Sequence, residues 1–295
     1  MSKSLNYTKV LWPELLYSPA LYIAALLFFC VCAFGDSAVL GDERYSVLEL
    51  LSERELYKKA YVSGEISAYS LFINYDSSRW FTVAVSVITA FPALKVYELN
   101  TNNLRITTLS RISRRNYINS LFSTVYFSGV LIALIGILLY SGMLWTLFPK
   151  LKSTSGNYFI EVYGSNHGER FLYILKKTIN CCLVCGIFPL LTVIFSQLVH
   201  DRFLSITFPM MMQYIFLKLD IIYSGWLYAD ENRSSLFFLK LIQVINPANC
   251  MFQYSYWKFL LGLPFACFGI LLLFEMLLLY LLFAKLQKLI IGEKI

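Results

Sequence analysis

The longest stretch of the chain without a charged side chain runs for 34 residues, from 116 to 149. A helix needs roughly 20 apolar residues to cross the hydrocarbon core of a bilayer, so this run is long enough to cross it. Similar uncharged runs cover 15–35 and 178–200. Of all 295 residues, 58% are apolar and 15% are charged, against about 45–50% and about 25% in soluble domains. The sequence therefore predicts an integral membrane protein.

Two further segments are apolar enough to cross the membrane although each contains one charged residue. Segment 80–97 includes Lys95, whose long stem can carry its charge to the interface. Segment 259–284 is interrupted once, by Glu275. The predicted fold class is an all-α integral membrane protein with six transmembrane helices and short interfacial helices, in a single transmembrane domain, 1–295. The predicted crossings are about 15–35, 80–97, 117–147, 176–200, 203–227 and 259–284.

The fifth predicted crossing, 203–227, carries Lys218 and Asp220. Two alternatives remain open for it. Either one long crossing carries both charges near its outer half, or a shorter crossing ends near Leu217 and a re-entrant or interfacial helix follows. Both alternatives count as one crossing.

Basic residues set the predicted orientation, because Lys and Arg collect on the cytoplasmic side of membrane proteins. The connector between the second and third crossings has a single acid, Glu98, and five basic residues: Lys95, Arg105, Arg111, Arg114 and Arg115. We therefore expect a multi-pass protein of the plasma membrane with both termini in the cytoplasm. The net charge of +7 is then explained by orientation and contact with anionic lipids, and not by binding to nucleic acid.

Ionisable groups inside a crossing are costly and usually face protein or water. Glu275, Lys218 and Asp220 are therefore predicted to line a translocation path. The alternative for Lys218 and Asp220 is that they simply reach the outer interface. On the outer side, Leu48, Leu51 and Leu56 have helix-like spacing, which predicts a short amphipathic helix.

Motifs for catalysis are missing from the sequence. It contains no G-x-x-x-x-G-K-[ST] loop for a nucleotide and no H-E-x-x-H helix for zinc. Three cysteines, Cys181, Cys182 and Cys185, lie within the fourth predicted crossing. A soft metal could bind two of them, but small apolar residues that pack helices in lipid are the favoured interpretation. We expect no catalytic, cofactor-binding or metal-binding residues, and no enzyme activity in this chain alone.

Residues 91–129 resemble the permease subunits of type-2 ABC exporters. In that family a crossing ends at the cytoplasm with a Phe-rich turn and a Glu, a short helix follows, and an Arg-rich stretch opens the next crossing. The matching positions here are Phe91, Glu98, the stretch 102–109, then Arg111, Arg114, Arg115 and Tyr117. The acidic pair and Gly that often open this loop in the family are replaced here by Leu99, Asn100 and Thr101 after Glu98.

The resemblance implies that segment 98–116 is a coupling segment that docks on a separate ATPase. The residues expected to couple are Glu98, Asn102, Asn103, Arg105, Arg111, Arg114 and Arg115. ATP and Mg²⁺ would be bound by the partner ABC ATPase, and a second copy or a paralogous permease would complete the pathway. The implied function is ATP-driven export by alternating access. The alternative is a polytopic membrane scaffold or assembly factor that transports nothing.

Overall fold

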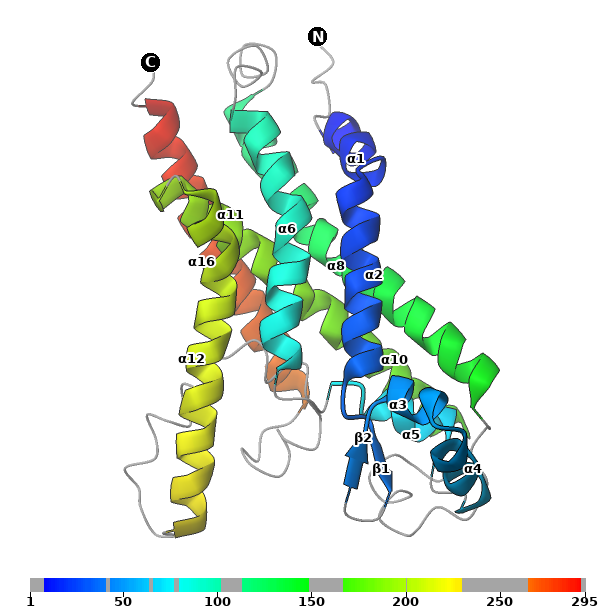
Figure 1. Cartoon of the computed structure of the whole chain (residues 1–295). Coiled ribbons are helices and arrows are strands. Elements are labelled where there is room, and N and C mark those ends of the chain that lie inside the picture. Colours follow the sequence, from blue (N-terminus) through cyan, green and yellow to red (C-terminus); the bar gives the residue numbers. More distant parts are fainter. Residues whose placement is uncertain are drawn as a thin grey trace.

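The computed structural model (Figure 1) describes residues 8–40, 43–63, 66–76, 80–101, 113–148, 167–199, 201–229 and 265–292. Helices make up most of these residues. Their bounds are α1 Thr8–Leu16, α2 Pro19–Phe34, α3 Val47–Ser52, α4 Arg54–Ser63, α5 Ala68–Ile73, α6 Phe81–Thr101, α8 Arg114–Leu147, α10 His167–Cys185, α11 Ile187–Val199, α12 Arg202–Ala229 and α16 Phe265–Gly292. Two short strands, β1 Ala38–Leu40 and β2 Glu43–Tyr45, form an antiparallel hairpin in which Ala38 pairs with Tyr45.

The long helices run alternately from one end of a bundle to the other (Figure 1). We call the end at which α1 begins and α16 ends the terminal end, and the end that carries β1 and β2 the hairpin end. From the terminal end α2 descends to the hairpin, α6 returns, α8 descends, α10 and α11 return, α12 descends and α16 returns. The start of α8 lies at the terminal end too, because the Arg114 side chain donates a 2.6 Å hydrogen bond to the carbonyl of Lys288 near the end of α16.

Side chains at the helix starts explain where several of these elements begin. Ser46 and Glu49 form a capping box at α3, in which each side chain accepts a hydrogen bond from the other's backbone N–H. The Ser113 hydroxyl accepts from the N–H of Asn116 at the start of α8. The Asp201 carboxylate accepts from the N–H of Leu204, at 2.8 Å, at the start of α12. Each cap satisfies an N–H that the helix itself leaves without a partner.

Helix α8 forms the centre of the bundle and packs against α2, α6, α10 and α11. Two of its glycines allow close contact. A Cβ on Gly136 would lie 2.6 Å from the ring of Phe28 in α2, and a Cβ on Gly129 would lie 2.3 Å from the backbone oxygen of Cys185 in α10. Small residues that let backbones approach are typical of helix interfaces in membranes.

A joint at Gly186 separates α10 from α11. The N–H of Gly186 still donates to the carbonyl of Cys182, at 3.2 Å. A side chain has no room here, because a Cβ on Gly186 would lie 2.5 Å from the ring of Tyr126 in α8. The fourth predicted crossing, 176–200, is therefore two helical pieces joined end to end.

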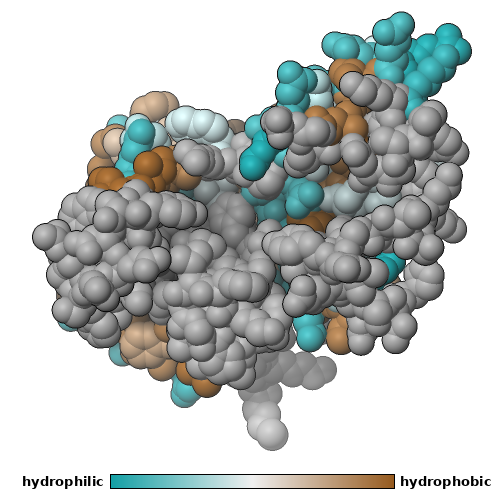
Figure 2. Space-filling model, turned by 90° about the horizontal axis from the view of Figure 1, so that it is seen from below, coloured by the Kyte–Doolittle hydropathy of each residue, from teal (hydrophilic) through white to brown (hydrophobic). Residues whose placement is uncertain are grey.

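At the hairpin end the sequence predicted one amphipathic helix, and the structure has two. Helix α3 ends at Ser52 and α4 begins at Arg54. The residues of α3 that are buried are Val47 and Leu50, whereas Leu51 of the predicted stripe is exposed. Figure 2 views the molecule from this end and shows hydrophilic side chains gathered on the side where α3 and α4 lie.

Among the described residues, three helical segments are long and apolar enough to cross a membrane: Arg114–Leu147, Arg170–Val199 and Gly269–Leu289. Pro19–Phe34 and Phe81–Leu94 are shorter apolar helices. The mostly helical fold that the sequence predicts is thus confirmed, and its apolar helices are compatible with insertion into a membrane. The count of six crossings stays a prediction.

Several boundaries differ from the predicted ones. The first predicted crossing, 15–35, contains the junction between α1 and α2, where Pro19 starts a new helix after Ser18. Helix α6 continues to Thr101, and α8 begins at Arg114. Both helices therefore extend into the predicted coupling segment, 98–116. Polar and basic residues can continue a helix beyond the apolar part, so the hydrophobic run alone does not mark its ends.

Candidate functional site

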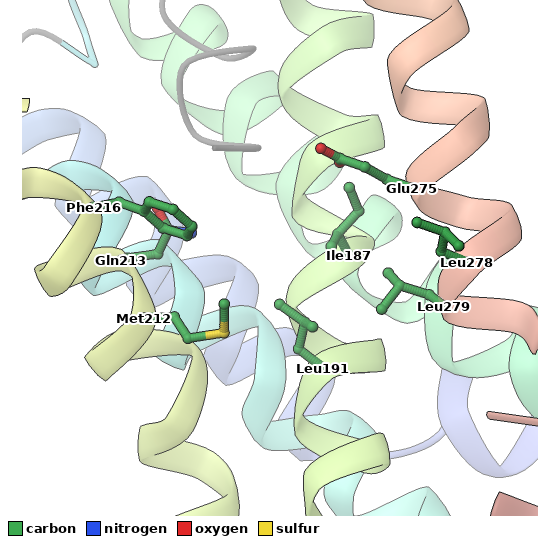
Figure 3. Close-up of a pocket in the computed structure, with 8 residues that line it drawn as sticks. All are labelled: Ile187, Leu191, Met212, Gln213, Phe216, Glu275, Leu278 and Leu279. Carbon is green, nitrogen blue, oxygen red and sulfur yellow. The ribbon is translucent and has the colours of Figure 1, made fainter. Parts of the chain in front are cut away.

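A cavity of about 170 Å³ lies between α11, α12 and α16 (Figure 3). Helix α11 forms its floor, and side chains of α12 and α16 face each other across it in Figure 3. Six of the lining residues are apolar: Ile187, Leu191, Met212, Phe216, Leu278 and Leu279. The two polar ones are Gln213 of α12 and Glu275 of α16. The surface that these residues present to the cavity is almost wholly apolar.

Neither polar group is satisfied by the part of the chain that the structure describes. Gln213 is buried, at 2% exposure, and its side-chain oxygen accepts no hydrogen bond there. Glu275 is half-buried and has no ion-pair or hydrogen-bond partner among the same residues. An unsatisfied buried acceptor costs roughly 1–3 kcal/mol, and among the residues that line the cavity this cost falls on the Gln213 oxygen.

Of the three residues predicted to line a translocation path, the structure describes the side chains of Glu275 and Lys218. Glu275 lines the cavity, as described above. Lys218 is exposed, and its ammonium lies 5.4 Å from the ring of Tyr214, which itself stacks on Trp80. Asp220 lies on α12, and its side chain is outside the described residues. Helix α12 continues through both positions to Ala229, so no helix break follows Leu217.

A buried ion pair between Lys177 and Asp76 connects the hairpin end to α10. The ammonium of Lys177 lies 2.8 Å from Oδ1 of Asp76 and also donates to the carbonyl of Ile73. The Tyr75 ring lies 4.9 Å from the same ammonium, which adds a cation–π contact. Both charged side chains are almost fully buried. This ion pair ties the segment after α5 to α10, which follows it by about a hundred residues.

The surroundings of Asp76 alter its acid–base behaviour. Burial raises the pKa of the Asp76 carboxyl above its ordinary value, while the charge of Lys177 and its hydrogen bond act in the opposite direction. Oδ2 of Asp76 accepts no hydrogen bond from the described residues. The ion pair therefore recovers only part of the free energy that Asp76 loses when it leaves water, because one carboxylate oxygen contacts Lys177 and the other contacts no donor of the described residues.

Of the residues predicted for ATPase coupling, the structure describes the side chains of Arg114 and Arg115. Arg114 and Arg115 occupy the first turn of α8 and are exposed. Glu98 lies on α6, and its side chain is outside the described residues. Asn102, Asn103, Arg105 and Arg111 also lie outside them. The structure thus brings the end of α6 and the start of α8 to one end of the bundle, and the coupling role of these residues stays a prediction.

The three clustered cysteines lie in the interior of the bundle. Cys181, Cys182 and Cys185 are buried and free, and Cys185 lies against Gly129 of α8. Within the described ranges, no group of three or more His, Cys, Asp and Glu side chains could hold a metal ion. Cysteine acts here as a small apolar residue between helices.

Sequence reasoning singled out Glu275 because a charge in an apolar run is conspicuous. It missed Gln213, Asp76 and Lys177. Gln213 is uncharged, and nothing in the sequence reports that α12 and α16 approach α11 from two sides. Asp76 falls in a predicted connecting segment and Lys177 at the start of the fourth predicted crossing, 176–200, and charged residues are ordinary at both places.

No protein-family model, curated protein or solved structure is significantly similar to this chain.

Proposed function

We propose that this chain is the membrane-spanning permease subunit of an ATP-driven exporter of the type-2 ABC class. It would act with a separate ATPase and with a second permease, either another copy or a paralogue. The observation that carries the proposal is that the start of α1, the end of α16, the end of α6 and the start of α8 share one end of the bundle (Figure 1). A topology with both termini and the Arg-rich connector in the cytoplasm is compatible with this shared end.

The exposed surface of α16 supports the membrane part of the proposal. Large apolar side chains are exposed over most of its length: Ile270, Leu273, Phe274, Leu277, Leu278, Leu281, Leu282 and Leu289. An apolar face of this extent is unstable in water and needs lipid or another protein to cover it. A helix at the perimeter of a membrane bundle meets that requirement.

The connection of α8 to α16 supports the coupling part. The Arg114 side chain, at the start of α8, donates a hydrogen bond to the carbonyl of Lys288 near the end of α16, and the middle of α16 lines the cavity through Glu275. An ATPase that displaced the start of α8 would therefore act on the helix that carries Glu275. Alternating access by such a movement is a shift between two conformations, driven by ATP in the partner subunit.

The test is purification of the tagged chain from its native membrane, followed by identification of bound proteins. An ABC ATPase in stoichiometric amount is expected, and charge reversal at Arg111 or Arg114 is expected to lower permease-dependent ATP hydrolysis by about tenfold, the effect of a coupling free energy of about 1.4 kcal/mol. Arg54→Glu, an exposed arginine on α4 at the hairpin end, is the matched control and should change nothing. A chain that copurifies with no ATPase, but with subunits of another membrane assembly, would support the scaffold alternative instead.

A further inference from the structure

We infer that the cavity between α11, α12 and α16 holds the methyl end of a lipid acyl chain, which enters beside Leu278 from the bilayer. The inference goes beyond the proposed function, because it concerns the lipid around the protein and requires neither an ATPase nor a transported substrate. It requires only that α16 lies in a membrane.

The first step is the chemistry of the cavity wall. The surface presented to the cavity is almost wholly apolar, although Gln213 and Glu275 are among the lining residues. Water does not suit such a space, because an ordered water needs about two to four polar partners. Hydrocarbon does suit it, since it supplies the dispersion contacts that side chains lack around an empty volume.

The second step is access from the surface. Leu278 lines the cavity and is 49% exposed, so the cavity reaches the outer surface of α16 there. The neighbouring exposed side chains of α16 are also apolar: Leu273, Phe274, Leu277, Leu281 and Leu282. In a membrane, acyl chains cover a surface of this kind. The cavity is therefore continuous with the surface that lipid would cover.

The third step is depth in the bilayer. The apolar segment of α16 runs from Gly269 to Leu289, and Leu278 and Leu279 lie at its middle. The middle of a segment that crosses a hydrocarbon core of about 30 Å is the level at which the acyl chains of the two leaflets end. The part of a lipid that reaches the cavity is therefore the methyl end of a chain, and not a headgroup.

The fourth step is size. The cavity has a volume of about 170 Å³. A cavity of about 150 Å³ holds a benzene ring, which has six carbons. The space between α11, α12 and α16 therefore has room for about six carbons at the end of one chain, and it is too small for a whole lipid.

The experiment is photolabelling of the purified full chain in nanodiscs of phosphatidylcholine that carries a diazirine near the methyl end of one acyl chain. Light converts the diazirine to a carbene that inserts into nearby bonds, and mass spectrometry of peptides locates the adducts. We expect adducts on Ile187, at the floor of the cavity, and on Leu273, which surrounding lipid reaches in any case. The same lipid with its diazirine beside the glycerol should not label Ile187.

Three variants test the route and the space. Leu278→Trp places a larger side chain at the opening, and Leu191→Phe fills the interior. Each should remove the adduct on Ile187 and keep the adduct on Leu273. Leu282→Trp is the matched control and should keep both adducts, because Leu282 is 46% exposed one turn further along α16 and does not line the cavity.

Two results would overturn the inference. One is a parent chain that is labelled at Leu273 and not at Ile187; if that chain is also dimeric in the nanodisc, a second copy covers the opening in place of lipid. The other is loss of the Ile187 adduct in Leu282→Trp to the same extent as in Leu278→Trp. Because no ATPase takes part, neither result bears on the proposed permease function, which copurification decides separately.

Discussion

The ammonium of Lys177 and the carboxylate of Asp76 are 2.8 Å apart in the interior, with about 4% and 2% of their side chains exposed. They join the hairpin end of the molecule to α10, a helix that leads toward the cavity. Removal of one partner from such a pair leaves an uncompensated buried charge.

Asp76→Asn is therefore expected to lower the free energy of unfolding by about 3–5 kcal/mol. The double variant Asp76→Asn with Lys177→Met should recover part of this loss, because it also removes the remaining charge. Denaturation in detergent micelles measures both. Lys58→Met, at an exposed lysine of α4, is the control and should shift stability by no more than about 0.5 kcal/mol.

The pH dependence of stability follows from the raised pKa of Asp76. The folded chain keeps the proton of this carboxyl at a pH where the unfolded chain has released it. The contribution of Asp76 to stability therefore falls as pH rises from about 4, the ordinary Asp value, through the raised value. Melting temperatures of the parent chain and of Asp76→Asn, measured between pH 4 and pH 8, should differ in slope across that window. Parallel curves would contradict the prediction.

Close packing of α8 predicts a difference between two of its glycines. Gly129→Ala places a methyl group 2.3 Å from a backbone oxygen of α10, which the helices can relieve only by moving apart. We expect a loss of about 1–3 kcal/mol, typical of overpacking. Gly142→Ala meets no atom within 4 Å and should leave stability unchanged or raise it by up to about 1 kcal/mol. Thermal unfolding of the two variants and of the parent chain measures both changes in stability.

Loss of a hydrogen bond between α8 and α16 should lower the free energy of unfolding by less than the Gly129→Ala substitution does. The Tyr280 hydroxyl donates a 2.7 Å hydrogen bond to the side-chain oxygen of Asn119. Tyr280→Phe removes the hydroxyl and should cost about 0.6 kcal/mol, the average for hydrogen bonds between membrane helices. Tyr22→Phe, at an exposed tyrosine of α2, should cost less. Equal effects for the two variants would show that the contact does not stabilise the bundle.

Hydrophobic runs predicted the helical part of this fold well, because a long apolar stretch has few alternatives to a helix. The run 116–149 corresponds to α8, and 178–200 to the end of α10 together with α11. The apolar run 178–200 could not reveal the joint at Gly186, because glycine is tolerated inside apolar helices. Glycine is needed at this position because the ring of Tyr126, on another helix, leaves no room for a side chain. The division of the hairpin end into α3 and α4 was also missed, because a regular leucine spacing does not report where a helix stops.

The candidate site was only half accessible from the sequence. A lone acid in an apolar segment identifies Glu275, but the partner across the cavity depends on how three helices are placed. Lys218 is also a charged residue in an apolar segment, but its ammonium lies over the ring of Tyr214 and not in the cavity lining. Spacing along one helix predicts which residues share a face, and it cannot predict which face meets another helix.

The joint between α10 and α11 divides the fourth long segment into two halves with different contacts. Lys177 holds the first half to the hairpin end, whereas Ile187 and Leu191, which follow the joint, form the floor of the cavity. A hinge-like change of bend at Gly186 would therefore widen or narrow the space in front of Glu275 while the buried ion pair stays intact.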